Sequence, residues 1–152
     1  MACSAFVAIG ANLGDARETV RRAMDDLDRL PRTRVSARSS LYRSAPVDAG
    51  GPDFVNAVVA LQTELDPHAL LAELQRLEAG AGRERPYRNA PRTLDLDLLR
   101  HGDAVLDTPQ LSLPHPRMAE RAFVLLPLAE IAPEQVTSQQ LAQVAAQRIE
   151  RL

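Results

Sequence analysis

Residues 88–99 have the sequence Arg-Asn-Ala-Pro-Arg-Thr-Leu-Asp-Leu-Asp-Leu-Leu. The second half of this stretch predicts a β-strand, because Leu94, Leu96 and Leu98 alternate with polar residues. The alternation places Asp95 and Asp97 together on the opposite face, with their Cα atoms about 6.5–7 Å apart. Two carboxylates at that spacing can hold Mg²⁺, which takes few protein oxygens and leaves room for phosphate and water.

The segment before this strand is rich in arginine, with Arg83, Arg85, Arg88 and Arg92 within ten residues. Arginine is the side chain best suited to bidentate contact with phosphate. An acidic pair beside an arginine-rich loop therefore indicates metal and nucleotide chemistry. The alternative is an exposed sheet face beside a solvated run of charges, and the spacing alone leaves both open.

The composition limits the classes of protein to which this chain can belong. A chain of 152 residues with 45% hydrophobic content is expected to form one domain, residues 1–152, with a substantial core. Its net charge of −2 creates no positive field that would recruit nucleic acid. All 18 basic residues are arginine, which excludes a lysine-containing phosphate loop and a lysine nucleophile.

Cysteine content and apolar runs indicate the compartment. The single cysteine, Cys3, excludes an intramolecular disulfide. The sequence contains neither a signal-peptide pattern nor an apolar run of the roughly 18 residues that a membrane span needs. We therefore expect a cytoplasmic protein without a membrane partner.

The pattern along the chain predicts two helices and four strands in the order β-α-β-β-α-β. Asp15, with Glu18 three residues later, and Asp66, followed by proline, are typical helix N-caps. The strands are expected over residues 5–10, 35–42, 54–63 and from Asp95 onward. This order is typical of an α+β, ferredoxin-like fold, in which an antiparallel sheet carries helices on one face. The other face would be free for a ligand.

Two further elements are expected after the fourth strand. His101-Gly102-Asp103 predicts a hairpin turn into a short strand over residues 104–106. Ser138 is expected to cap a C-terminal helix, because the apolar positions that follow have helical spacing. These positions are Leu141, Val144, Ala145, Ile149 and Leu152.

Several short motifs follow one another along the chain. They are Ala8-Ile9-Gly10-Ala11-Asn12-Leu13-Gly14, Leu41-Tyr42-Arg43-Ser44, Phe54-Val55-Asn56, the 88–99 run, Pro114-His115-Pro116-Arg117-Met118, Arg121-Ala122-Phe123-Val124 and Pro127-Leu128-Ala129-Glu130-Ile131-Ala132-Pro133. Together they resemble the 6-hydroxymethyl-7,8-dihydropterin pyrophosphokinase family of folate biosynthesis. The Arg-x-Ala-Pro-Arg-x-x-Asp-Leu-Asp motif is the most specific of them. The resemblance implies transfer of the β,γ-pyrophosphoryl group of ATP to the pterin hydroxymethyl oxygen, with release of AMP.

The resemblance also implies roles for individual residues. Asp95 and Asp97 would bind two Mg²⁺ ions, and Asp95 would also orient or deprotonate the pterin hydroxyl, while Arg83 and Arg92 would act on the phosphates. The implied nucleotide contacts are Gln75, Glu78, Arg83, Arg85, Arg92, Leu98, Ser112, His115 and Arg121. The implied pterin contacts are Ser44, Val47, Phe54, Asn56, Asp95 and Phe123.

The residue types in the implied pterin pocket suit a flat heterocycle. Phe54 and Phe123 offer aromatic faces, and Asn56 offers both a donor and an acceptor to the amide edge of a ring. An asparagine inside an apolar strand also needs a partner, because burying an unpaired amide is costly. One departure from the family is Asn89, where many members have tryptophan, and Tyr87 is a candidate substitute.

Two other functions would require sequence features that differ from those of this chain. A ferredoxin-like regulatory or RNA-binding domain should show stacking aromatics and a basic patch, but aromatic content is 3% and the chain is slightly acidic. A two-metal phosphodiesterase should show more His or Asp ligands near the acidic pair. The expected partners are therefore ATP and the pterin, with no nucleic acid, and the protein is expected to be a monomer.

Overall fold

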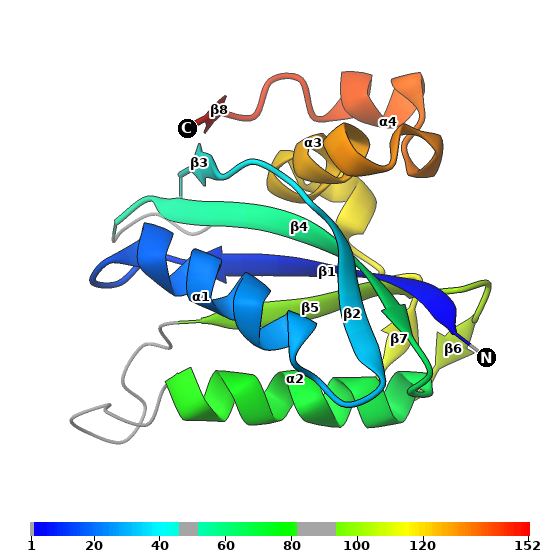
Figure 1. Cartoon of the computed structure of the whole chain (residues 1–152). Helices are drawn as coiled ribbons and strands as arrows, with labels where there is room; N and C mark the ends of the chain where they lie inside the picture. The colour runs from blue at the N-terminus through cyan, green and yellow to red at the C-terminus, as the bar shows by residue number, and fades with distance from the viewer. Residues whose placement is uncertain (1, 46–51, 82–93) are drawn as a thin grey trace.

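The computed structural model describes residues 2–45, 52–81 and 94–152 (Figure 1). Mixed helices and an antiparallel sheet confirm the α+β class. The elements are β1 (Cys3–Ala11), α1 (Ala16–Asp28), β2 (Thr33–Arg38), β3 (Tyr42–Ser44), β4 (Phe54–Thr63), α2 (Pro67–Ala81), β5 (Asp95–His101), β6 (Leu106–Asp107), β7 (Ser112–Leu113), α3 (Ala122–Ile131), α4 (Ser138–Gln143) and β8 (Ile149–Arg151), with short 3₁₀ turns at Met118–Glu120 and Pro133–Gln135.

The main sheet has the strand order β5-β1-β4-β3-β8, and β2 also pairs with β4. Every pairing in it is antiparallel. The strand expected over residues 35–42 is in fact two strands, β2 and β3, which pair with successive parts of β4. Ser39 joins them, because its N–H donates to Val58 O at 3.0 Å and its Oγ accepts from Val58 N at 2.9 Å.

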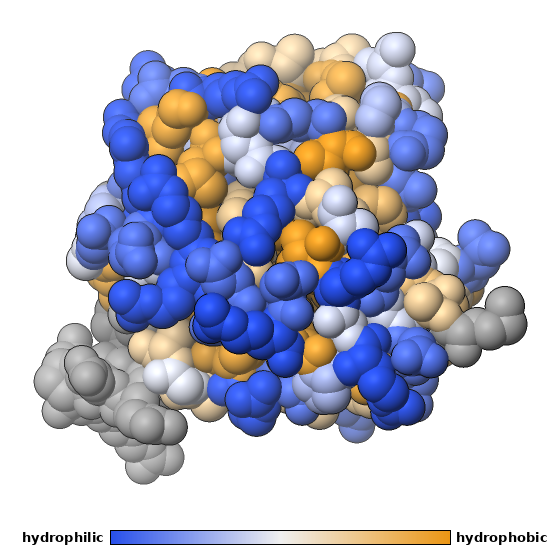
Figure 2. Space-filling model, in the orientation of Figure 1, coloured by the Kyte–Doolittle hydropathy of each residue, from blue (hydrophilic) through white to orange (hydrophobic). Residues whose placement is uncertain are grey.

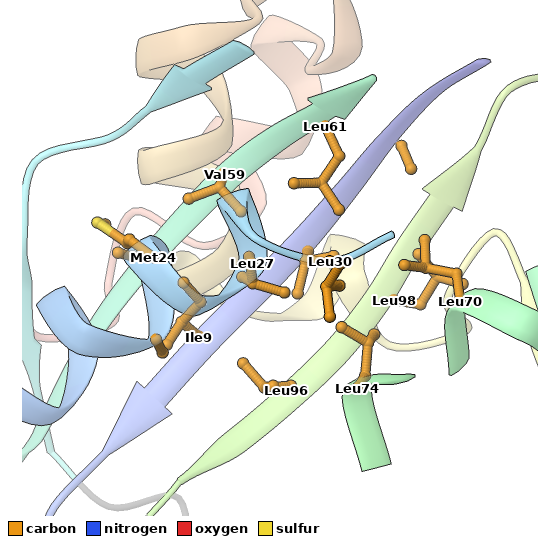
Figure 3. Packing of buried hydrophobic residues seen from close by; sticks show 14 of the residues in the cluster. Ile9, Met24, Leu27, Leu30, Val59, Leu61, Leu70, Leu74, Leu96 and Leu98 are labelled. Atoms are coloured by element: carbon orange, nitrogen blue, oxygen red, sulfur yellow. The ribbon is translucent and has the colours of Figure 1, made fainter. Parts of the chain in front are cut away.

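Helices α1 and α2 cover one face of the sheet (Figure 1). Figure 3 shows the apolar side chains of both helices packed against the sheet, with Leu70 and Leu74 of α2 beside Leu96 and Leu98 of β5. The outer side of α1 is polar, and hydrophilic side chains cover much of the front of the molecule in Figure 2. Leu96 and Leu98 of β5 thus face α1 and α2, as the period-two alternation predicted.

Helix α3 packs on the opposite face, so the expectation of helices on one face only was wrong. Val124 and Leu128 of α3 form a second apolar cluster with Phe6, Val58 and Leu99 of the sheet. Both β1 and β4 are apolar along most of their length, so apolar side chains project from both faces of the sheet. The second face therefore also needs to be covered. The face left for a ligand is therefore limited to the end of the sheet beyond this cluster.

The C-terminal segment also differs from the expectation. Thr137 rather than Ser138 caps α4, and the helix ends at Gln143 instead of continuing to Leu152. The last residues form β8, which pairs with β3 so that Ile149 lies opposite Ser44. An added strand satisfies the main-chain groups that β3 would otherwise expose at the sheet edge.

The hairpin expected after β5 is not formed with β5. Residues Leu106–Asp107 pair instead with Ser112–Leu113 in a separate two-stranded sheet. Gly102 does adopt a positive φ of 54°, as the predicted turn requires. None of the helices in the described part of the chain has the length and apolar character of a membrane span.

Candidate functional site

Three neighbouring strands bring polar residues into one row. Asp95 of β5 lies opposite Gly10 of β1, and Gly10 lies opposite Asn56 of β4. Directly opposite residues of an antiparallel pair project from the same face. This face is the one opposite α1 and α2, because the intervening leucines of β5 are in the core beneath those helices. Asp97 lies in the next row, opposite Ala8.

Gly10 leaves space at the centre of this row, because glycine has no side chain. A Cβ atom at residue 10 would lie 3.5 Å from Asn56 Oδ1 and 3.8 Å from Phe54 Cδ1. The missing side chain therefore leaves room between the carboxylate on β5 and the amide on β4. Gly10 belongs to the Ala8–Gly14 motif, and no separate role was predicted for it, although a glycine inside a strand indicates close approach of another group.

Asn56 is buried, at 4% exposure, and its amide is held in a fixed orientation. Its Nδ2 donates a hydrogen bond of 2.7 Å to Ser44 Oγ on β3. This donation satisfies part of the buried amide and directs Oδ1 toward the space above Gly10. The structure thus brings together two of the residues predicted to contact the pterin.

The predicted aromatic residues come from different elements. Phe54 begins β4, Phe123 lies in the first turn of α3, and both are partly buried. The guanidinium carbon of Arg121 lies 5.5 Å from the centroid of the Phe123 ring, which is cation–π distance. Ser44, Arg121 and Phe123 border a cavity of about 540 Å³ at the N-terminus of α3.

His115 interacts electrostatically with Asp97 of the acidic pair and with Arg117 and Arg121. Its main-chain N–H donates to Leu99 O at 2.9 Å, and its Nδ1 accepts from Arg117 N at 3.1 Å. Burial lowers the pKa of His115; the charge of Asp97 opposes this, and the charges of Arg121 and Arg117 add to it. The charges of Asp97 and Arg121, predicted from distant motifs, thus both act on the His115 ring.

Helix α2 supplies a contact at the free edge of β5. Glu78 accepts a hydrogen bond of 2.8 Å from the main-chain N–H of Leu96, and Gln75 is exposed one turn earlier. The side chain of Leu98 is 3% exposed and lies in the core, so only its main chain can meet a nucleotide. Ser112 is partly buried on β7.

The acidic pair suits magnesium better than a metal that needs a complete protein cage. Asp95 is exposed and Asp97 partly buried. Within residues 2–45, 52–81 and 94–152, no group of three His, Cys, Asp or Glu side chains could hold a metal ion. Mg²⁺ typically uses one or two carboxylates and completes its shell with waters and substrate phosphates.

The predicted residues Val47, Arg83, Arg85 and Arg92, with Tyr87, Arg88 and Asn89, lie outside the described residues.

A hydrogen-bond network that the sequence analysis did not foresee joins α3 to β3. Glu130 of α3 accepts from Tyr42 Oη at 2.7 Å, from Ser40 N at 3.0 Å and from Ser40 Oγ at 2.9 Å. Burial and the hydrogen bond to Glu130 raise the pKa of Tyr42 to about 12. Burial by itself would raise the pKa of Glu130, but the hydrogen bonds from Tyr42 and Ser40 lower it.

We expect Tyr42→Phe to lower the free energy of unfolding at pH 7 by about 1.5–3 kcal/mol, the range for a hydrogen bond to a charged group. The wild type should also lose stability as the pH rises from about 10, where an unfolded tyrosine ionises, toward the folded pKa of about 12. The variant should lack this part of the pH dependence. Urea unfolding across pH 7–11 measures both effects.

The chain provides a matched control for this prediction, because its only other tyrosine is Tyr87. Tyr87→Phe should leave the alkaline loss of stability in place. The assignment to Tyr42 is contradicted if Tyr42→Phe and the wild type lose stability equally above about pH 10.

Known proteins resemble this chain in sequence over most of its length. The sequence model of the family described as 7,8-dihydro-6-hydroxymethylpterin-pyrophosphokinase (HPPK) matches residues 6–133. A Pseudomonas aeruginosa protein named 2-amino-4-hydroxy-6-hydroxymethyldihydropteridine pyrophosphokinase is 51% identical over 130 residues, which cover 85% of this chain and 80% of that protein. Proteins of the same name from Methylorubrum extorquens and Haemophilus influenzae are 44% and 42% identical, and the alignments cover 87% and 88% of this chain and 84% of each relative.

Solved structures show the same fold. The wild-type Plasmodium falciparum HPPK-DHPS structure with pterin and p-hydroxybenzoate superposes with a TM-score of 0.71 at 14% identity. The match covers 99% of this chain and 45% of that chain, so the present chain spans less than half of that longer protein. At this identity the likeness is evidence for the fold alone.

Proposed function

The chain belongs to the 7,8-dihydro-6-hydroxymethylpterin-pyrophosphokinase family, and we propose that the row Asp95–Gly10–Asn56 is its active site. The enzyme is an ATP-dependent diphosphotransferase of folate biosynthesis, which transfers pyrophosphate to the pterin hydroxymethyl group and releases AMP. The observation that carries the site assignment is the alignment of a carboxylate, a gap and a fixed amide across three strands. The carboxylate would meet the metal and the pterin hydroxyl. The gap would hold the pterin ring, and the amide would bind the edge of the ring.

Asn56 recognises the amide edge of the pterin. The hydrogen bond from Nδ2 to Ser44 fixes the orientation of its side chain, so the oxygen and the second N–H are presented to a ligand without reorganisation. Phe54 and Phe123 supply the aromatic faces for the ring. A ring held in this way lies over Gly10, where the absence of a side chain leaves space.

The hydroxymethyl group then points toward β5. Two strand spacings separate Asn56 from Asp95, a distance of about 10 Å, and the ring spans most of it. Asp95 is exposed on the ligand face, so its carboxylate can orient the hydroxyl or accept its proton.

Asp95 and Asp97 would hold the magnesium of the ATP complex, and we propose two ions. When bound, magnesium neutralises charge on the transferring group and on the attacking and leaving oxygens. The carboxylates contribute a fixed pair of oxygens on one strand face, which positions the nucleotide phosphates relative to the pterin hydroxyl.

His115 acts as a neutral hydrogen-bond donor in this site. Its Nδ1 accepts from the Arg117 main chain, so the proton of the neutral ring is on Nε2. The lowered pKa keeps the ring neutral at pH 7. His115 Nε2–H and the Arg121 guanidinium can then donate to phosphate, together with Arg83, Arg85 and Arg92, while Gln75, Glu78, Ser112 and the Leu98 main chain border the nucleotide.

The activity is tested by incubating the protein with ATP, Mg²⁺ and 6-hydroxymethyl-7,8-dihydropterin and measuring AMP. Pterin-free and metal-free reactions are the controls. AMP that requires both the pterin and Mg²⁺ is the expected result. ATP consumption without pterin would instead support a phosphodiesterase, and nucleotide binding without AMP formation would support a binding module.

We expect Gly10→Val to raise the KM for the pterin by about 10- to 100-fold, because the added methyl groups fill the space over the sheet where the ring lies. The control is Gly80→Ala at the end of α2, where an added Cβ meets nothing within 4 Å. Steady-state kinetics with varied pterin check both variants. An unchanged pterin KM in a folded Gly10→Val protein would contradict the placement of the ring.

We also propose that residues 1–152 form one pyrophosphokinase domain that acts as a monomer in the cytoplasm, where ATP is available. Light scattering during size-exclusion chromatography tests the monomer. A dimer mass at micromolar protein would contradict it.

A further inference from the structure

The loop between α4 and β8 reaches back to the active site through Gln147. The side-chain Oε1 of Gln147 accepts a hydrogen bond of 2.9 Å from Ala122 N, and its Nε2 donates one of 2.8 Å to Glu120 O. Glu120 and Ala122 are the two neighbours of Arg121 in the chain. One amide thus fixes the main chain on both sides of this arginine.

This arrangement compensates for a helix start that has no local cap. Arg121 is the N-cap of α3, with φ −125° and ψ 113°, and makes no side-chain capping hydrogen bond. The first N–H groups of a helix lack partners within the helix, and Ala122 is buried at 2% exposure. Gln147, 25 residues away in sequence, supplies the missing acceptor.

The groups fixed in this way are the ones that face the ligands. Arg121 stacks on Phe123 at 5.5 Å, and both border the cavity that also includes Ser44 and Gln147. Ser44 is also paired with Ile149 of β8, so the same C-terminal segment supports the pterin side. The segment lies beyond residue 133, where the family match ends.

We propose that Gln147 is a positioning residue of the active site, which holds Arg121 in the geometry for phosphate contact. The inference rests on the proposed function of the site. Gln147 carries no charge, so its contribution is geometric: it limits the movement of the Arg121 main chain. Small displacements of a group that contacts the transferring phosphates cost a large factor in rate.

Gln147→Met tests the proposal, because methionine keeps the length of the side chain and removes both hydrogen bonds. Gln147→Ala is the second variant, in case methionine packs badly. We expect kcat/KM for ATP and the affinity for a non-hydrolysable ATP analogue each to fall about tenfold. The matched control is Gln139→Met, a change at an exposed glutamine of α4 in the same segment, which should leave kcat/KM unchanged.

A double-mutant cycle with Arg121→Ala separates positioning from general damage to the fold. The Gln147 change should cost about tenfold in the wild type and less than about twofold in the Arg121→Ala background. Equal losses in both backgrounds, or no loss in the wild type, overturn the proposal. The same cycle is measured as affinity for a non-hydrolysable ATP analogue by calorimetry. If the wild type makes no pterin-dependent AMP, the proposed function fails, and the binding cycle still decides the role of Gln147.

Discussion

Asp97→Ala is expected to lower kcat for AMP formation by at least about 10³-fold while leaving the protein folded, because the carboxylate would hold the magnesium that neutralises charge on the reacting phosphates. The side chain projects from the ligand face of β5, opposite the leucines that pack under α1 and α2. Removing this side chain therefore takes one carboxylate from the site without leaving a cavity in the main core. Steady-state measurement of AMP formation with saturating ATP, Mg²⁺ and pterin gives kcat, and urea unfolding gives the stability.

Asp103→Ala is the control for this experiment, since Asp103 is an exposed aspartate in the turn directly after β5. It should retain full activity. A near-normal kcat in Asp97→Ala would refute the assignment of Asp97 to the metal and phosphate site. A loss of kcat accompanied by unfolding would point to a structural role for the carboxylate instead.

The same variant has a second readout that does not depend on activity. The charge of Asp97 raises the pKa of His115 against the larger lowering effect of burial. Removing Asp97 should therefore lower the pKa of His115 further. An NMR titration of the imidazole compares the variant with the wild type, and an unchanged pKa would mean that the two groups do not interact.

The main sheet and the acidic pair were predictable because both depend on short-range patterns. Alternation over Leu94–Leu98 fixes which face each side chain takes once one face is buried. Asp15 accepts from Glu18 N at 3.2 Å, as its position before an apolar helical stripe predicted. Such signals lie within a few residues of the element that they define.

The features that could not be predicted depend on contacts between distant segments. Ile149 and Leu152 fit the spacing of a helix, yet Leu152 N donates to Leu41 O at 2.9 Å, because the free edge of β3 is available. The hydrogen bonds of Glu130 and Gln147 cross 88 and 25 residues, respectively. No periodicity marks residues of this kind, although they hold the strand and the helix start that carry Ser44 and Arg121.

Asn56→Ala is expected to lower kcat/KM for the pterin by about 10³-fold, because a site built to hydrogen-bond one edge of its ligand loses strongly when that edge is left unpaired. The loss should appear mainly in the pterin KM. Affinity for an ATP analogue, measured without pterin, should stay within about twofold, since Asn56 faces the ring pocket two strands from β5.

Ser44→Ala tests whether the amide must be fixed as well as present. Without Ser44 Oγ, the Nδ2 group of Asn56 loses its 2.7 Å partner, and the amide can rotate. We expect a loss of about tenfold in pterin kcat/KM, smaller than for Asn56→Ala because the recognising groups remain.

Gln62→Ala is the matched control, because Gln62 is the other amide of β4 that donates to a serine on a neighbouring strand, at 2.8 Å to Ser4 Oγ. It lies at the opposite end of β4 from Asn56, so its removal should leave pterin kinetics unchanged. If Gln62→Ala impairs pterin use as much as Asn56→Ala, the effect comes from weakening β4 and not from lost recognition. If Asn56→Ala reduces ATP-analogue affinity and pterin affinity by equal factors, the amide supports the whole site and does not select the pterin.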